Sequence, residues 1–227
     1  MTSVRGVLLD IDGTLVDSND AHARAWADAF AKHGYHVSFD KVRSCIGMGG
    51  DKLIQAVVNL PKDDPQAQEL SRQYGEIVRT NYLPYVRPFP GAKALVEHMH
   101  QRGLTLIVAS SAQKPDAEAL LNIVGITQII DDITSANDVD NTKPDPDILQ
   151  VALNKGRLAA NEAVAIGDTP YDVQAAQRAG VRCIAFRCGG WRDRDLKGAI
   201  EIYDGPWHLL AQYDQSLLAQ MYAAQRC

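Results

Sequence analysis

The chain has 227 residues, of which 46 % are hydrophobic and 22 % are charged, and its formal net charge at pH 7 is -5. This length suits one large domain or one domain with a smaller insert, and the composition is typical of a globular protein. The acidic balance argues against a nucleic-acid partner and against an anionic membrane surface, because both attract basic proteins. An anionic substrate would therefore have to be attracted by local charges.

The sequence shows neither a targeting signal nor a metal-binding cysteine pattern. Its N-terminus lacks a basic stretch followed by an apolar run, and no apolar run of about 18 residues suggests a transmembrane helix. No cysteine forms a Cys-x-x-Cys pair or clusters with histidine, which disfavours a zinc site. The pattern predicts a cytoplasmic protein with reduced thiols. The cysteines are Cys45, Cys183, Cys188 and Cys227.

The first predicted element is the strand Val4–Asp10, an apolar run typical of a parallel strand buried on both faces. The chain continues Asp10-Ile11-Asp12-Gly13-Thr14, so two carboxylates lie close together where the strand stops. Like charges repel, and a hard divalent cation such as Mg²⁺ would stabilise them. Gly13 allows the chain to leave strand geometry here. The simpler alternative is a turn-forming Asp-Gly at a strand end.

The segment between this strand and Gly91 shows helical patterns and no clear strand. A crossover of this length predicts an inserted helical cap domain over residues 17–89, with hinges at residues 16–19 and Leu83–Phe89. Because it leaves from the carboxyl end of a strand, it would cover the crevice where such sheets bind ligands and would exclude water. The alternative is a stabilising insertion that lies away from the site. The predicted helices are His22–His33, Phe39–Arg43, Lys52–Val58 and Gln66–Tyr82.

The remainder of the chain alternates strands with helices. The predicted strands are Leu104–Ala109, Ile129–Thr134, Ala163–Gly167, Val181–Phe186 and the shorter Ala199–Tyr203. The predicted helices are Pro90–Arg102, Pro115–Val124, Pro146–Lys155, Pro170–Ala179, and a tail helix over Trp207–Arg226 that breaks near Asp214. Left-handed residues are expected after the first four of these helices, at Gly103, Gly125, Gly156 and Gly180. The alternation predicts an α/β fold, with a Rossmann-like doubly wound parallel sheet formed by residues 1–16 and 90–227.

Polar residues follow two further strands of this predicted sheet. Ser110 and Ser111 come after the second strand, where hydroxyl and backbone N–H groups could bind a phosphoryl oxygen or simply form a turn. Lys143 precedes Pro144, which favours an extended backbone and leaves its ammonium free to reach the sheet edge. A solvated surface lysine is the alternative.

Two acids mark the end of the fourth predicted strand. Asp168 follows the strand and Asp172 lies one helical turn further on. Asp168 is a candidate metal ligand that Asp172 would support, although both acids could simply complement the helix N-terminus. Because the carboxyl ends of parallel strands meet at one edge of a sheet, these acids can converge with the polar residues of the other strand ends.

In this order, the four segments resemble the four motifs of the haloacid dehalogenase superfamily over residues 7–187: Asp-x-Asp-Gly-Thr, a serine that ends a strand, a lysine before proline, and Gly-Asp-x-x-x-Asp. The resemblance implies that Asp10 is a nucleophile that accepts a phosphoryl group and that Asp12 is the general acid/base. It implies that Ser110 and Lys143 bind the phosphoryl charge. It also implies that Mg²⁺ is held by Asp10, the backbone carbonyl of Asp12, and Asp168, with support from Asp172.

The second acid of the first motif disfavours dehalogenation, since haloacid dehalogenases proper lack it. The stretch from Asp17 to Trp26 resembles the cap entry of β-phosphoglucomutase, in which a histidine at the position of His22 gates proton transfer. Phosphatases of the same subgroup share much of this stretch. The alternative is that His22 is an ordinary polar residue on a helix face.

The stretch Ile46–Leu53 resembles the substrate loop of the same cap. We therefore expect Gly47 and Lys52 to contact the substrate. Gly49-Gly50 stand where the mutase carries an arginine for a distal phosphate, which weakens the mutase hypothesis because Lys52 offers no bidentate fork.

These observations predict a Mg²⁺-dependent phosphatase that hydrolyses a small phosphomonoester, a sugar phosphate or a phosphoglycolate-like compound, through an aspartyl-phosphate intermediate. The alternative is a phosphomutase similar to β-phosphoglucomutase. A phospho-accepting receiver domain and a catalytically inactive scaffold fit the motifs less well. The predicted partner is a small phosphorylated metabolite rather than a nucleic acid or membrane, and the protein is expected to be a monomer or dimer.

Overall fold

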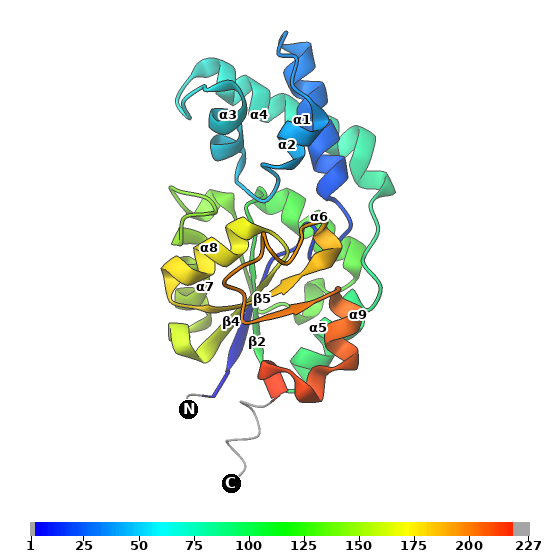
Figure 1. The fold of residues 1–227 in the computed structure, drawn as a ribbon, viewed down its shortest axis with the longest axis vertical. Helices are drawn as coiled ribbons and strands as arrows, with labels where there is room; N and C mark the ends of the chain where they lie inside the picture. The colour runs from blue at the N-terminus through cyan, green and yellow to red at the C-terminus, as the bar shows by residue number, and fades with distance from the viewer. Residues whose placement is uncertain (1–2, 220–227) are drawn as a thin grey trace.

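The structure, a computed structural model, describes residues 3–219. Its centre is a sheet of six parallel strands in the order β3-β2-β1-β4-β5-β6 (Figure 1). The strands are β1 (Gly6–Leu9), β2 (Thr105–Ala109), β3 (Asp132–Thr134), β4 (Ala163–Gly167), β5 (Arg182–Phe186) and β6 (Glu201–Tyr203). This order is that of a Rossmann-like sheet: β2 and β3 are added on one side of β1, and β4, β5 and β6 are added on its other side.

Strand β1 pairs with β2 on one edge and with β4 on the other, and apolar cores cover both of its faces. Val7 and Leu9 join the apolar core on one face of the sheet, whereas Leu8 joins the core on the other. The alternation of side chains along a strand explains why a continuous apolar run was needed at this position.

Helices cover both faces of the sheet, which confirms the predicted doubly wound α/β fold. On one face lie α5 (Ala92–Gln101), α6 (Lys114–Val124) and α9 (Pro206–Ala211), and on the other lie α7 (Asp147–Gly156) and α8 (Pro170–Ala179) (Figure 1). Each helix contributes its apolar side chains to the core on its own face, as amphipathic helices do.

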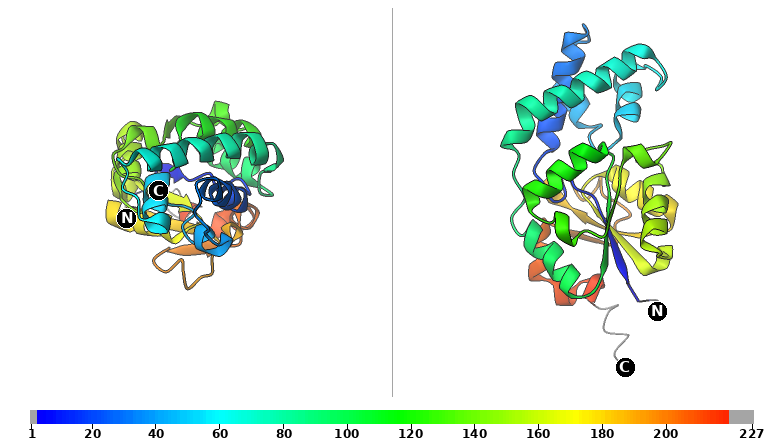
Figure 2. Two further views of the ribbon diagram at one scale, coloured as in Figure 1. Left: turned by 90° about the horizontal axis from the view of Figure 1, so that it is seen from above. Right: turned by 180° about the vertical axis from the view of Figure 1, so that it is seen from behind.

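The segment after β1 forms a helical body beyond the carboxyl ends of the strands, as Figures 1 and 2 show from two sides. It contains α1 (Asn19–Lys32), α2 (Phe39–Arg43), α3 (Gly50–Val58) and α4 (Pro65–Ile77), the last continued by a π-helix over Val78–Tyr82. This body has an apolar cluster of its own, which includes Trp26, Phe30, Leu53 and Leu70.

The two connections between this helical body and the sheet lie side by side. Val16 and Pro88 form an antiparallel bridge. The amide of Asp17 donates to the carbonyl of Arg87 at 2.9 Å, and the amide of Phe89 donates to the carbonyl of Leu15 at 2.9 Å. An insertion whose entry and exit are paired can move about one narrow neck.

Several predicted boundaries differ from the structure. β3 begins at Asp132 rather than Ile129, because Thr127–Ile129 form a 3₁₀ turn before it. α1 begins at Asn19, inside the predicted hinge, and α5 begins at Ala92, after Gly91 in a left-handed conformation (φ 73°).

The prediction for Gly156 was wrong, although Gly103, Gly125 and Gly180 do adopt the expected positive φ. Gly156 is the last residue of α7, and Arg157 takes the left-handed conformation with φ 51°. A Cβ on Gly156 would lie 3.0 Å from Cδ1 of Leu158 and 3.3 Å from Cγ1 of Ile107, so close packing against β2 explains this glycine.

The chain after β6 follows the predicted break. α9 ends at Ala211, and a short 3₁₀ turn spans Tyr213–Gln215 around Asp214. The part of the predicted tail helix after residue 219 lies outside the described residues.

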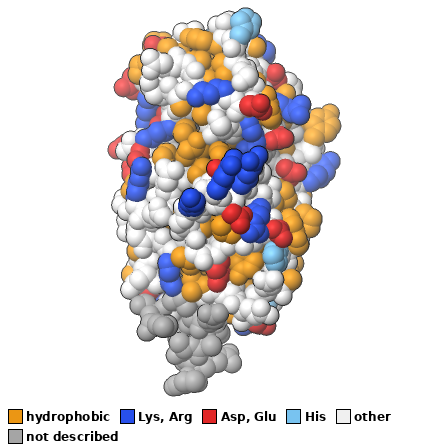
Figure 3. All heavy atoms as spheres, in the orientation of Figure 1, with side chains coloured by type: hydrophobic (Ala, Val, Ile, Leu, Met, Phe, Trp, Pro, Cys, Tyr) orange, Lys and Arg blue, Asp and Glu red, His pale blue; other side chains and the backbone are white. Residues whose placement is uncertain are grey.

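Between residues 3 and 219, no helix combines the length and apolar character needed to cross a bilayer. On the face shown in Figure 3, acidic and basic side chains lie interspersed.

Candidate active site

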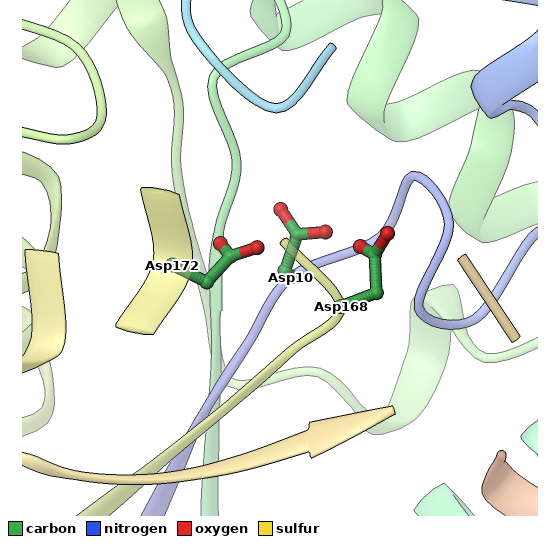
Figure 4. A group of neighbouring side chains, drawn as sticks. All are labelled: Asp10, Asp168 and Asp172. Atoms are coloured by element: carbon green, nitrogen blue, oxygen red, sulfur yellow. The ribbon is translucent and has the colours of Figure 1, made fainter. Parts of the chain in front are cut away.

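Three carboxylates meet at the carboxyl ends of β1 and β4 (Figure 4). Asp10 directly follows β1, Asp168 directly follows β4, and Asp172 lies in the first turn of α8; all three are buried, with one oxygen of each within 4.8 Å of the others. The hydroxyl of Thr14 lies 3.0 Å from Oδ2 of Asp10 and 3.0 Å from Oδ1 of Asp168, which ties the two strand ends together.

Burial dominates the electrostatics of these acids. It raises the pKa of Asp10 to about 7, with Lys143 opposing the rise and Asp172 and Asp12 adding to it. Burial also raises the pKa of Asp168 well above its usual range, and the charges of Asp172 and Asp10 push it in the same direction. Carboxylates crowded in this way favour a hard divalent cation, so the residues present fit Mg²⁺.

Lys143 supplies a positive charge inside this group. Its side chain is 2 % exposed, and Nζ lies 2.7 Å from Oδ1 of Asp10 and 2.7 Å from Oδ1 of Asp172. Burial tends to lower the pKa of Lys143, but Asp10 and Asp172 outweigh it and raise that pKa above the usual lysine value. The ammonium thus reaches inward as the Lys-Pro pattern predicted, and the Lys143–Pro144 peptide bond is cis.

Asp172 holds this lysine in place. One carboxylate oxygen binds the ammonium, and the other accepts hydrogen bonds from the amide of Thr169 at 3.0 Å and from its hydroxyl at 2.6 Å. The sequence predicts that Asp172 supports a metal; its contacts in the structure are with Lys143 and Thr169.

The side chain of Asp12 is engaged separately from the three carboxylates. Oδ1 lies 2.7 Å from Nε2 of His22 and accepts a hydrogen bond from the hydroxyl of Ser18 at 2.5 Å. The other ring nitrogen of His22, Nδ1, lies 2.7 Å from the hydroxyl of Tyr74 in α4. These contacts connect Asp12, the predicted acid/base residue, to α1 and α4 of the helical body, which we call the cap. Because the side chain of Asp12 is engaged in this way, its backbone carbonyl is the atom expected to bind a cation.

The charges of Asp12 and His22 stabilise one another. Burial by itself raises the pKa of Asp12, but the charge of His22 and the hydrogen bonds from His22 and Ser18 outweigh it and lower that pKa. Burial by itself lowers the pKa of His22, but Asp12 outweighs it and raises the histidine pKa. Both shifts favour the ion pair, in which a protonated imidazole lies against the Asp12 carboxylate.

Two serine hydroxyls line the same space. Ser110 is buried after β2, and its Oγ accepts a hydrogen bond from the amide of Ala112 at 3.1 Å, which leaves its own proton available. The Oγ of Ser111 is buried and has no hydrogen-bond partner within residues 3–219. Both serines line one cavity with Asp10 and Asp12, where two hydroxyl donors suit an anionic ligand.

The cavity lies between the sheet edge and the cap, and its volume is about 590 Å³. Gly47, which the sequence predicts to contact the substrate, lines this cavity. Its φ is 105°, and a Cβ there would lie 2.6 Å from Cγ2 of Thr169, so this position requires glycine. Lys52 was predicted to contact substrate, but in the structure its ammonium is ion-paired with Asp145 of the core instead. Residues of the cap wall include Trp26, Met48, Ser71, Tyr74 and Arg79.

Sequence reasoning missed several residues of the site. Thr14 belongs to the recognised first motif and could have been found there. Asn19, whose Nδ2 donates to Oδ2 of Asp168 at 2.8 Å and to the carbonyl of Gly189 at 3.1 Å, resembles an ordinary helix-start residue in the sequence. Tyr74 is separated from His22 by 52 positions, and only the packing of α4 against α1 brings them together.

Relatives of this chain are known. The chloroplastic protein SUPPRESSOR OF QUENCHING 1 of Arabidopsis thaliana is 36% identical over 194 residues, which span 81% of this chain but only 18% of that protein. The phosphoglycolate phosphatase of Yersinia pestis is 33% identical over 192 residues, 82% of each chain. The fructose-1-phosphate phosphatase YqaB of Escherichia coli strain K12 is 27% identical over 182 residues, 80% of this chain and 96% of the relative.

Solved structures share the fold. A hydrolase from Pseudomonas syringae superimposes with a TM-score of 0.87 at 26% identity, covering 95% of this chain and 99% of that one. The β-phosphoglucomutase of Clostridium difficile superimposes with a TM-score of 0.79 over 98% of both chains, and at 19% identity this likeness concerns the fold alone. A family model for haloacid dehalogenase-like hydrolases matches residues 7–186. The chain therefore belongs to the haloacid dehalogenase-like hydrolase family.

Proposed function

We propose that this protein is a Mg²⁺-dependent phosphatase that hydrolyses a small phosphomonoester through an aspartyl phosphate on Asp10. The observation that carries the proposal is the placement of a buried nucleophile beside a buried ammonium, with the Asp12–His22 pair on the same cavity. The phosphatase relatives support it. We further propose that residues 17–89 form a cap domain that closes over a core of residues 1–16 and 90–227.

In the first step, a carboxylate oxygen of Asp10 attacks phosphorus while the bond to the leaving oxygen breaks. The leaving oxygen takes a proton from Asp12, which receives that proton from Nε2 of His22 across 2.7 Å, so Asp12 ends the step as a carboxylate and His22 as a neutral imidazole. Lys143 and the hydroxyls of Ser110 and Ser111 bind the oxygens of the transferring group.

In the second step, a water molecule attacks the phosphorus of the aspartyl phosphate and gives its proton to the carboxylate of Asp12. The bond between phosphorus and Asp10 breaks, which releases inorganic phosphate and restores the nucleophile. Asp10, Asp168 and the backbone carbonyl of Asp12 would hold Mg²⁺, which when bound supplies positive charge to the phosphoryl oxygens.

The direct test is hydrolysis of p-nitrophenyl phosphate with Mg²⁺. We expect phosphate release that stops after exhaustive EDTA treatment and returns with Mg²⁺. Asp10→Asn should abolish turnover and leave the fold intact by circular dichroism, because the amide cannot replace the carboxylate nucleophile. Full activity of this variant, or of the metal-free wild type, would refute the proposal.

A phosphomutase remains the second candidate, since His22 contacts Asp12 and could delay hydrolysis of the phospho-enzyme. A mutase must also anchor a second phosphate. At the expected position of the mutase arginine, Gly50 packs against Trp26, and a Cβ added to Gly50 would lie 3.1 Å from Cζ2 of Trp26. The ammonium of Lys52 is ion-paired with Asp145. Hydrolysis is therefore favoured.

The two candidates are separated by supplying β-glucose 1-phosphate with a trace of the 1,6-bisphosphate. Phosphate release without formation of glucose 6-phosphate is expected. Isomerisation much faster than phosphate release would overturn the phosphatase proposal.

A further inference from the structure

The cap and the core meet at a charged pair on the wall of the cavity. Arg79 lies in the π-helix after α4, Asp116 lies in the first turn of α6, and NH1 of Arg79 is 3.2 Å from Oδ1 of Asp116. Both residues line the cavity. The Asp116 side chain is only 16 % exposed, and α6 lies next to the cap helices in Figures 1 and 2. This pair is absent from the motifs found in the sequence.

The pair lies within electrostatic reach of the acid/base residues. Asp12 opposes burial and raises the pKa of His22, and the charge of Asp116 adds to that rise. Burial and then Asp12 raise the pKa of Tyr74, and Asp116 again adds to the rise. Gly75 provides room for the guanidinium, because a Cβ there would lie 3.1 Å from NH1 of Arg79. A glycine inside a helix is less favourable than alanine, and here it allows Arg79 to fold against α4.

A guanidinium paired with a carboxylate offers hydrogen-bond donors and acceptors side by side without net charge. Hydroxyl groups can satisfy both partners, because each hydroxyl donates and accepts. A carboxylate or second phosphate on the leaving group would be attracted by Arg79 but repelled by Asp116. Further acids, Asp51, Asp63 and Asp140, line the same cavity. Of its other cations, Arg72 is paired with Glu69 and Glu76, and the ammonium of Lys62 is bonded to the carbonyl of Asp140 at 2.9 Å.

We propose that Arg79 and Asp116 are the specificity element of this site, selecting phosphate esters whose leaving group is uncharged and rich in hydroxyls over esters that carry a carboxylate or a second phosphate. The inference rests on the proposed phosphatase function. The cavity volume of about 590 Å³ lies within the range of about 300–1,000 Å³ typical of small-molecule sites, and far exceeds what a two-carbon leaving group fills. Because the relatives include phosphatases of both substrate kinds, the chemistry of this pair decides between them.

The experiment measures kcat/KM of the wild type and of Asp116→Asn for fructose 1-phosphate, sorbitol 6-phosphate and 2-phosphoglycolate. The wild type should prefer the polyol esters. Asp116→Asn leaves Arg79 as an unopposed cation, so the ratio of polyol ester to phosphoglycolate should fall by about tenfold or more, mainly through a lower KM for phosphoglycolate. Asp116→Ser, which keeps a small polar side chain in the first turn of α6, repeats the test independently.

Two further variants complete the design. Arg79→Gln should weaken the polyol esters without any gain for phosphoglycolate, because Asp116 is then an unopposed anion that repels the phosphoglycolate carboxylate. Asp214→Asn is the control, because Asp214 also belongs to an Arg–Asp pair, with Arg102 at 3.0 Å, but does not line the cavity. It should leave the ratio of polyol ester to phosphoglycolate unchanged.

The outcomes are distinct. A wild type that prefers 2-phosphoglycolate, or an unchanged ratio in both Asp116 variants, would overturn the specificity proposal while the phosphatase function stands. Failure of the wild type to release phosphate from every ester, including p-nitrophenyl phosphate, would overturn the proposed function and this inference with it.

Discussion

Replacing Lys143 with methionine should remove the one cation that lies among the buried carboxylates described here. Its Nζ lies 2.7 Å from an oxygen of Asp10 and 2.7 Å from an oxygen of Asp172. Two unit charges about 4 Å apart interact by about 4 kcal/mol at an effective dielectric constant near 20. Breaking a buried ion pair on one side costs about 3–5 kcal/mol of stability, because the remaining charge stays buried.

The catalytic loss follows from the same contacts. Lys143 opposes the burial that already raises the pKa of Asp10 to about 7, so without it less of the nucleophile is ionised at neutral pH. The transferring phosphoryl group also loses a donor, and removing one such donor typically lowers kcat about 10²–10³-fold. We therefore expect kcat/KM of Lys143→Met for p-nitrophenyl phosphate to fall at least about a hundredfold.

The stability of this variant should depend on pH. A carboxyl whose pKa is higher in the folded protein than in the unfolded chain lowers the free energy of unfolding as pH rises from about 4 to its folded pKa. Because Lys143→Met raises the folded pKa of Asp10 further, urea midpoints should separate from the wild type more at pH 8 than at pH 5.

Lys155→Met is the matched control. Its Nζ lies 3.4 Å from an oxygen of Asp132 and 3.2 Å from an oxygen of Asp138, but the side chain is 25% exposed and does not line the cavity. Because Lys155 is paired with neither Asp10 nor Asp172, this variant should retain wild-type kcat/KM. A folded Lys143→Met variant with wild-type kcat/KM at saturating Mg²⁺ would refute the role assigned to Lys143.

Three further measurements test the site. His22→Asn should lower kcat and remove the stabilisation that the Asp12–His22 pair gives the wild type between about pH 4 and 6.5. In the wild type this stabilisation is lost as pH rises through the raised pKa of His22 or falls through the lowered pKa of Asp12. Urea midpoints that vary equally with pH in both proteins would contradict the ion pair. Thr14→Val should weaken Mg²⁺ activation by about tenfold, because the hydroxyl holds Asp10 and Asp168 together, and an unchanged Mg²⁺ titration would show that it does not. Lys52→Ala should raise KM less than about threefold, because its ammonium pairs with Asp145, and a much larger increase would restore Lys52 as a substrate ligand.

The sequence by itself was enough to predict the sheet and the helical insertion. Apolar runs that end on polar residues, and helices that begin with proline and end near glycine, are local signals, and each of the six predicted strands overlaps an observed one. Asp10, Lys143 and Asp168 were found in the same way, because the carboxyl ends of parallel strands must share one edge.

What the sequence left open depended on contacts between distant segments. It could not show that Lys52 would form an ion pair with Asp145, or that His22 would contact both Asp12 and Tyr74. These contacts exist only because the cap helices pack on one another and on the core. Arg79 and Asp116, 37 positions apart, are each ordinary surface charges in the sequence. Local propensity therefore determined the elements and the motif residues, whereas the tertiary packing of cap on core decided which charges remain available to a substrate.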